Sequence, residues 1–439
     1  MNNKGKIRLS TIIYFILIIF VLTFGWKIYS KYNFYDYVKG IRESGRQTSF
    51  VRDSNVKYSE KDSYKIENKE FNDSMFFKTI QVEPNTAYKV TCMVKTENVI
   101  AEEDKFIGGA QICINDTTEC SSPITGTNDW QELTFMFNSN SRTSVELGFR
   151  LGGYDELCKG TAWFSDMSIE EGKIDDDTNW NMVCFLIDNI ELENISLSMS
   201  DNDKSVIKEN MKRVQSSIGN LSGNQMSITY DIIEITEPLT TISYDEENKF
   251  YVGPKDVNKL IQKYLDKEEY DYIYVAVRLG DLEVTDELVS DWIGLGSMEY
   301  NQIGYSNIRL PSDRNSRLYK YSSSNTFPQE VFIHEFLHTL ERNEKENGND
   351  IADLHDSAIY GYENQQVNGL ENWYRDYMQD NINNQSGKGL TEFAYKSKPI
   401  HESNFNNSIR LDYLDQPDNI IEELNSIVKR LKRLSSGNI

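Results

Sequence analysis

The sequence has little positive charge and few cysteines, and each scarcity removes a class of protein. Its 439 residues carry a formal net charge of −23 at pH 7, whereas nucleic-acid binding needs a basic face to meet the phosphates. Its five cysteines include no C-x-x-C pair, which argues against a zinc site made of thiolates. We therefore expect no nucleic-acid partner and no cysteine-based zinc site.

Only one apolar run is long enough to span a membrane, and it decides the predicted compartment. Residues 9–26 are uncharged and mainly apolar, and at about 1.5 Å per residue they would extend about 27 Å, close to a hydrocarbon core. Lys4, Lys6 and Arg8 precede the run and favour a cytoplasmic start. Because no small-x-small cleavage site follows, we expect residues 1–26 to be a signal anchor rather than a cleaved signal peptide. The predicted localisation is the cell membrane, single-pass, with an extracellular C-terminal part.

The remainder divides into a stalk and two domains of different pattern. Residues 27–55 are polar and aromatic, as in a stalk. Residues 56–172 contain many short, partly alternating apolar runs separated by turn residues, a pattern typical of an all-β sandwich. Residues 178–439 alternate predicted strands and helices, which favours a mainly parallel, helix-covered sheet and an α/β domain.

The second domain is predicted in some detail. Its strands are expected at 182–187, 226–235 and 270–277, with edge strands at 293–296 and 303–310, and its helices at 201–218, 254–265, from Thr326 to Asn347, and at 418–434.

The sandwich region resembles jelly-roll carbohydrate-binding modules of families 4 and 9. The order of three segments carries the resemblance, namely residues 77–88, 126–130 and 160–167. The resemblance implies a jelly-roll fold and a polysaccharide partner, although such modules also serve as spacers. Sugar binding needs exposed rings that stack on apolar sugar faces. Tyr154 is the candidate, whereas Trp130 and Trp163 lie in strand patterns that predict core positions.

The four histidines include two in an H-E-x-x-H motif, His334-Glu335-Phe336-Leu337-His338. On a helix, His334 and His338 lie on one face about 6 Å apart in rise, so both can bind one Zn²⁺. Glu335 would accept a proton from a zinc-bound water as general base. The alternative is a helix with two structural histidines, but burying unpartnered imidazoles is costly.

This segment and the sheet before it resemble the zincin metallopeptidases. Glu341 and Glu344 stand where the extended metzincin motif places its glycine and third ligand. We expect His355 to be the third zinc ligand, with Asp356, Glu341 or Glu371 as alternatives. Glu341 also has the spacing of an ordinary helix ion pair with Lys345.

An aromatic segment follows, and Tyr374 or Tyr377 is a candidate for oxyanion stabilisation. We assign this catalytic role to Tyr377, with core packing as the alternative, and expect His401 to be a surface residue without a partner. Residues 293–310 are expected to offer an edge strand to an extended peptide.

The predicted function is a membrane-anchored extracellular zinc metallopeptidase that acts on a protein or glycoprotein and is targeted by its carbohydrate-binding-like module. The alternatives are a non-peptidase glycan-binding cell-surface protein and a glycan-processing hydrolase.

Overall fold

The structure is a computed structural model, and it describes residues 37–102, 107–154, 156–280, 292–311, 318, 327–365, 368–406 and 408–411. The chain forms two compact units. Unit 1 comprises the described residues up to Ile174 together with those from Glu402, and unit 2 comprises Asp175–His401. The predicted anchor (residues 1–26) and the predicted helix at 418–434 lie outside the described residues.

The predicted localisation needs correction. None of the helices that the structure describes combines the length and apolar character that a bilayer span requires. This finding overturns the prediction of a single-pass membrane protein, which rested on a segment outside the described residues.

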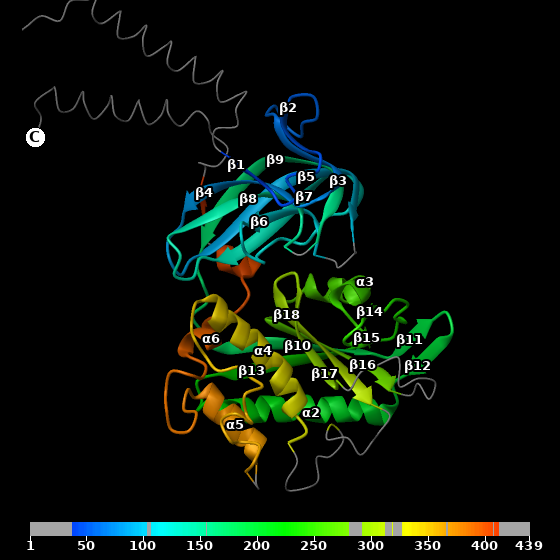
Figure 1. Cartoon of the computed structure of the whole chain (residues 1–439). Helices are drawn as coiled ribbons and strands as arrows, with labels where there is room; N and C mark the ends of the chain where they lie inside the picture. The colour runs from blue at the N-terminus through cyan, green and yellow to red at the C-terminus, as the bar shows by residue number, and fades with distance from the viewer. Residues whose placement is uncertain are drawn as a thin grey trace, which may run out of the picture. The chain divides into compact units, whose positions relative to one another are not determined.

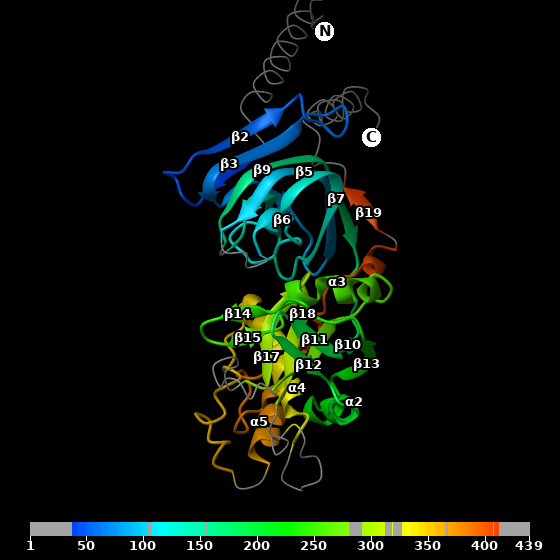
Figure 2. The same ribbon diagram turned by 90° about the vertical axis from the view of Figure 1, so that its right-hand side faces the viewer.

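Unit 1 consists of two antiparallel sheets that form a β-sandwich (Figures 1 and 2). The first sheet has the order β1 (Val38–Ile41), β4 (Ser74–Gln81), β8 (Ser144–Gly152), β6 (Gly109–Ile114). The second has the order β2 (Thr48–Asp53), β3 (Ser63–Asn72), β9 (Cys158–Gly172), β5 (Ala87–Ala101), β7 (Gly126–Asn138), with β19 (Ile409–Leu411) also paired to β9.

Alternation of side chains along the strands produces the core of unit 1. In β5 every second residue from Tyr88 to Val94 is buried, because successive side chains in a strand point to opposite faces. These residues join one apolar cluster with the other strands, in which the rings of Phe149 and Phe164 stack with centroids 4.7 Å apart. The predicted all-β jelly-roll sandwich is confirmed at this level of fold. Of the five cysteines, Cys113 and Cys120 form a disulfide.

The predicted stalk is wrong where the structure describes it. Within residues 27–55, β1 pairs with β4 and β2 pairs with β3, so this segment supplies two strands of the sandwich. Tyr37 is buried and its ring lies 5.0 Å from that of Tyr64. Phe50 packs on Phe76 with centroids 4.7 Å apart. These aromatic contacts fix the segment in the sandwich, although its polar composition predicted an exposed stalk.

Unit 2 has a five-stranded sheet with one antiparallel edge strand. Its strands follow the order β13 (Ser227–Ile235), β10 (Asn179–Ile187), β16 (Tyr272–Gly280), β18 (Ile303–Pro311), β17 (Gly294–Tyr300). The first four are parallel, and β17 pairs antiparallel with β18. Only β17 of the two predicted edge strands lies at the edge; β18 is interior because it pairs with β16 on one side and with β17 on the other. Two small hairpins accompany the sheet, β11 (Asn189–Leu192) with β12 (Ile195–Ser198) and β14 (Ser243–Asp245) with β15 (Lys249–Tyr251).

Helices cover both faces of this sheet (Figure 1). Apolar residues of α2 (Asp201–Leu221), α4 (Glu330–Glu346) and α5 (Gly369–Met378) share one cluster with β10 and β16. Those of α3 (Pro254–Leu265) pack on the opposite face. The alternation of strands and helices predicted for this region is therefore present, and a short helix, α6 (Glu392–Lys396), follows α5.

The end of the described chain does not belong to unit 2, although the second domain was predicted to run from 178 to 439. The short helix η2 (Glu402–Phe405) and β19 return to unit 1. There β19 pairs with β9, and Lys89 forms an ion pair of 2.9 Å with Glu402.

Candidate metal centre

The helix that carries the H-E-x-x-H motif is fixed on the sheet by aromatic side chains of β16. Tyr272 donates to the carbonyl of Glu335 at 2.9 Å, and Tyr274 donates to that of Phe332 at 2.8 Å. The helix begins at Glu330, later than predicted, and its N-cap Gln329 makes no capping bond. The Gln329 amide instead donates to Ser217 of α2 at 3.0 Å. Thr326, where the helix was predicted to begin, lies outside the described residues.

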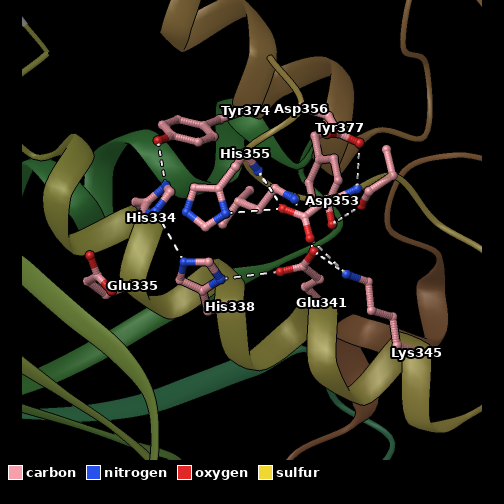
Figure 3. Close-up of polar contacts among 12 residues, drawn as sticks. His334, Glu335, His338, Glu341, Lys345, Asp353, His355, Asp356, Tyr374 and Tyr377 are labelled. Carbon is pink, nitrogen blue, oxygen red and sulfur yellow. Dashed lines mark hydrogen bonds and ion pairs between the residues drawn. The ribbon is translucent and has the colours of Figure 1, made fainter. Parts of the chain in front are cut away.

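Three imidazoles converge on one point at this helix (Figure 3). His334 and His338 extend from successive turns of α4, and His355 comes from the loop that follows. One ring nitrogen from each lies within 4.8 Å of the other two, the group of potential metal ligands found among the described residues. The Nε2 atoms of His334 and His338 are 3.2 Å apart. His334 and His338 are partly buried, whereas His355 is exposed.

Each imidazole is held from behind through its Nδ1 atom. His338 Nδ1 donates to Glu341 at 3.2 Å, and His355 Nδ1 donates to Asp353 at 3.1 Å. Behind His334, the hydroxyl of Tyr374 donates to Glu330 at 2.6 Å, which leaves its oxygen to accept from His334 Nδ1 at 2.9 Å. A proton on each Nδ1 leaves the lone pair of each Nε2 for a cation, as in zinc sites whose histidines donate to outer partners.

Glu335 is buried between α4 and the edge strand β17. A β-carbon at Gly294 would collide with its carboxylate, and one at Gly296 would lie 2.6 Å from Oε2. The register of β17 shifts between Leu295 and Met298, and Ser297 has a φ of +61°. The two glycines and this bulge let the strand backbone approach the carboxylate next to the imidazoles.

The alternative third ligands lie elsewhere. The Glu341 carboxylate accepts from His338, from Lys345 at 2.6 Å and from the amide of Leu354 at 3.0 Å, so it stands behind the imidazoles. Burial raises the pKa of Glu341, but these hydrogen bonds outweigh it and leave the pKa below its ordinary value. Asp356 accepts from the amide of Asp353 at 3.2 Å. Neither Asp356 nor Glu371 belongs to the ligand group found among the described residues.

Two residues are placed differently from the prediction. Tyr377 was assigned to oxyanion stabilisation, but its hydroxyl is fully buried and donates to the carbonyl of Ala352 at 3.1 Å. That position does not fit the predicted role; Tyr374, one turn earlier on the same helix, contacts His334 instead. His401 is not a lone surface residue, because its Nε2 lies 2.9 Å from the carboxylate of Asp271.

Of the three aromatic residues considered in unit 1, only Trp130 differs in burial from the prediction. Tyr154 is 55% exposed, as a sugar-stacking ring must be. Trp163 is buried as predicted, and its indole donates to Asp53 at 3.0 Å. Trp130 is only half-buried, and its ring lies 5.9 Å from that of the exposed Tyr58. The pair Tyr58 and Trp130 was not predicted.

Sequence reasoning also missed the groups behind the imidazoles. Glu330 lies one turn before His334, and Asp353 lies two residues before His355. The short spacing of Asp353 and His355 was a usable signal, because an aspartate readily accepts from groups two residues ahead. Glu330 acts through Tyr374, so only the tertiary structure shows its role.

Comparisons with known proteins find similarity among solved structures. No family model and no curated protein matches the chain. Among solved structures, the enzymatically active domain of tailspike protein 4 of bacteriophage CBA120 is 11% identical with a TM-score of 0.23, covering 32% of this chain and 20% of that one. The xylan-binding domain CBM22-1 of Paenibacillus barcinonensis Xyn10C is 13% identical with a TM-score of 0.22, covering 30% and 83%. A family-61 carbohydrate-binding module solved with β-1,4-galactotriose is 10% identical with a TM-score of 0.22, covering 30% and 86%. The alignment thus spans a fifth of the tailspike domain and most of each module.

Proposed function

We propose that unit 2 is a zinc-dependent hydrolase, specifically a peptidase, in which His334, His338 and His355 hold the metal and Glu335 is the general base. The observation that carries this proposal is the arrangement of the three imidazoles. Their Nδ1 atoms are all engaged from behind, and their remaining nitrogens face a common point.

The donor set fits zinc in number and spacing. Two nitrogens that share a tetrahedral zinc at about 2.0–2.1 Å lie about 3.3–3.4 Å apart, and the Nε2 atoms of His334 and His338 are 3.2 Å apart. Two lone pairs at that distance repel each other unless a cation lies between them. Three protein ligands leave a fourth position open, as in catalytic zinc sites. When bound, zinc would act as a Lewis acid that activates water and polarises a carbonyl.

Glu335 supplies the acid–base part of the proposed reaction. It follows His334 directly on α4, and its carboxylate is buried beside the backbone of β17. In this position it would accept a proton from the attacking water and deliver it to the leaving amine. A structural metal site does not require such a carboxylate.

The edge strand β17 supports a peptide as the substrate. Among the described strands it pairs only with β18, and an extended peptide can add to an open sheet edge through backbone hydrogen bonds. Because Gly294 and Gly296 lie against Glu335, a peptide on β17 would pass close to the proposed base.

A peptide-library screen with the full chain tests the proposal. The wild type should bind about one zinc per chain and cleave peptides. Glu335→Gln should keep the zinc and lose about 10²- to 10⁴-fold in kcat/KM. Glu346→Gln, a variant of an exposed residue on the same helix, serves as the control. A wild type without zinc, or a Glu335→Gln variant with full activity, would exclude this function.

A second candidate function is glycan binding by unit 1. The rings of Tyr58 and Trp130 form an accessible pair, with 53% of Tyr58 exposed. Such rings can stack on the apolar faces of sugars. Affinity electrophoresis in soluble xylan, β-glucan and galactan tests this function, with Trp130→Ala and Tyr58→Ala compared with Tyr154→Ala. Equal mobility of the wild type in all gels would exclude it.

A further inference from the structure

The third imidazole comes from a loop, and a network of charged side chains ties that loop to α4. Glu341 lies one turn after His338 on α4 and is 5% exposed. Its two carboxylate oxygens have separate contacts. Oε2 accepts from His338, and Oε1 accepts from Lys345 and from the backbone amide of Leu354. One carboxylate therefore contacts both an imidazole of the helix and the loop that carries His355.

The network continues to His355 through a second carboxylate. Lys345 lies 3.3 Å from Asp353 Oδ2. The other oxygen of Asp353 accepts from the backbone amide of His355 at 3.0 Å and from its Nδ1 at 3.1 Å. Figure 3 shows this chain of contacts running from His338 through Glu341, Lys345 and Asp353 to His355.

We infer that Glu341, Lys345 and Asp353 form a positioning network that docks residues 351–356 on α4 and holds His355 against the two helix imidazoles. The inference deepens the proposed function, because it rests on the same three-histidine site and explains how an exposed loop residue serves as the third ligand. None of the three residues faces the point on which the imidazoles converge. Their effect on metal binding is therefore indirect, through the orientation of His338 and His355.

Glu344 offers a matched control on the same helix. It is as buried as Glu341 and also accepts several hydrogen bonds, but its partners are Thr391 at 2.6 and 2.7 Å and the side chain of Asn349. Removing either carboxylate deprives the helix of a buried group with its partners. Glu341 holds the loop at Leu354, next to His355, whereas Glu344 contacts it only at Asn349, six residues before His355.

Hydrogen exchange of the metal-free full chain tests the docking without requiring any metal. Glu341→Ala should speed exchange of the Leu354 amide by about threefold to tenfold, the value of one lost hydrogen bond. Glu344→Ala should leave that amide unchanged. Equal exchange at Leu354 in the wild type and Glu341→Ala would overturn the inference, whether or not the protein proves to be an enzyme.

Zinc affinity, measured by competition with a chromophoric chelator, tests the consequence for the site. Asp353 is half exposed, so Asp353→Ala should fold even if Glu341→Ala does not. It should weaken zinc binding by about tenfold, at the lower end of the usual range for such outer groups. In a His355→Ala background the same substitution should change nothing, because Asp353 acts through His355. A loss of equal size in both backgrounds would show that Asp353 acts through its charge and would overturn the positioning role.

Discussion

The two units differ in what they bury. The core between the sheets of unit 1 is an apolar cluster, whereas α4 in unit 2 carries four buried glutamates, Glu330, Glu335, Glu341 and Glu344. A buried carboxylate is costly unless hydrogen bonds replace the lost water. In unit 2 those bonds come from Tyr374, His338, Lys345, Leu354 and Thr391.

This difference shows which buried residues of each unit are explained by packing alone. The core of unit 1 is explained by packing, because the side chains between its sheets form an apolar cluster. Its buried polar residues, such as Asn68, Asn72 and Arg150, have hydrogen-bond partners within the unit. The pattern of α4 is not explained by packing, since leucine would fill the same positions at lower cost. Two of these glutamates connect to an imidazole, Glu341 directly through His338 and Glu330 through Tyr374, whereas Glu344 binds Thr391 and Asn349.

The largest expected effect concerns the third imidazole. His355→Ala should weaken zinc binding so far that little zinc survives gel filtration, because two imidazoles on one helix do not close a tetrahedral site, while the weaker binding stays measurable by chelator competition. His401→Ala, which removes a histidine paired with Asp271, should retain about one zinc per chain. Metal analysis after gel filtration measures both. Full zinc content in His355→Ala would transfer the third-ligand role to another group.

The next effect tests a buried ion pair in unit 2 against an exposed one in unit 1. Arg278 and Asp203 are 2.8 Å apart with side chains 6% and 1% exposed. Asp203→Asn should lower the free energy of unfolding by on the order of 3 kcal/mol, because it leaves a buried charge without its partner. Glu402→Gln, which breaks the pair with Lys89, should cost roughly 0.5 kcal/mol. Urea unfolding measures both, and similar losses would contradict the contrast between a buried and an exposed ion pair.

The same pair predicts a pH dependence. Burial raises the pKa of Asp203, but hydrogen bonds from Ser200 and the charge of Arg278 outweigh it and leave the pKa below the ordinary value of 3.8. The pair should therefore stabilise unit 2 fully above that ordinary value, and this contribution should disappear as the pH falls through the lower folded-state pKa. Unfolding measured between pH 2 and 6 should show a smaller loss in Asp203→Asn than in the wild type.

The next prediction concerns the close approach of Gly296 in β17 to the carboxylate of Glu335. Gly296→Ala places a methyl group against its carboxylate and should lower kcat/KM by about 100-fold, the usual result of misplacing a catalytic group by about 1 Å. Zinc content should be unchanged. Gly219→Ala, where the nearest atom to the new carbon is 3.5 Å away, is the control. A loss of zinc in Gly296→Ala would mean that β17 supports the imidazoles rather than Glu335.

The smallest expected effect concerns the hydroxyl behind His334. Tyr374→Phe should weaken zinc binding by about tenfold, because His334 loses the partner that fixes its tautomer. Tyr395→Phe also removes a buried hydroxyl, one that donates to the carbonyl of Met378, and should leave the affinity unchanged. Chelator competition compares the two, and equal affinities would remove Tyr374 from the site.

The parts of the site that could be predicted from the sequence are those set by local spacing. His334, Glu335 and His338 are neighbours on any helix, and the scarcity of histidine drew attention to His355. Tyr374 and Tyr377 show the limit. They are one helical turn apart, so only the rotation of α5 against α4 decides which hydroxyl reaches His334.

The fold shows the same limit. Strands with a marked apolar run were predicted to within three residues at each end, such as β13 (predicted at 226–235) and β10 (predicted at 182–187). The predicted stalk contains β1 and β2, whose residues are largely polar. β2 pairs with the next strand, β3, but β1 pairs with β4, which is more distant in the sequence. Pairing of β19 with β9 could not be predicted for the same reason.

The return of the chain to unit 1 bears on how the protein is made. Unit 2 is inserted between β9 and β19, so the ribosome must complete all of it before β19 can join its sheet. The proposed catalytic unit can then fold as a unit while the sandwich still lacks that strand. A chain that stops within unit 2 would lack β19. The pairing of β9 with β19 therefore forms only in chains that include all of unit 2.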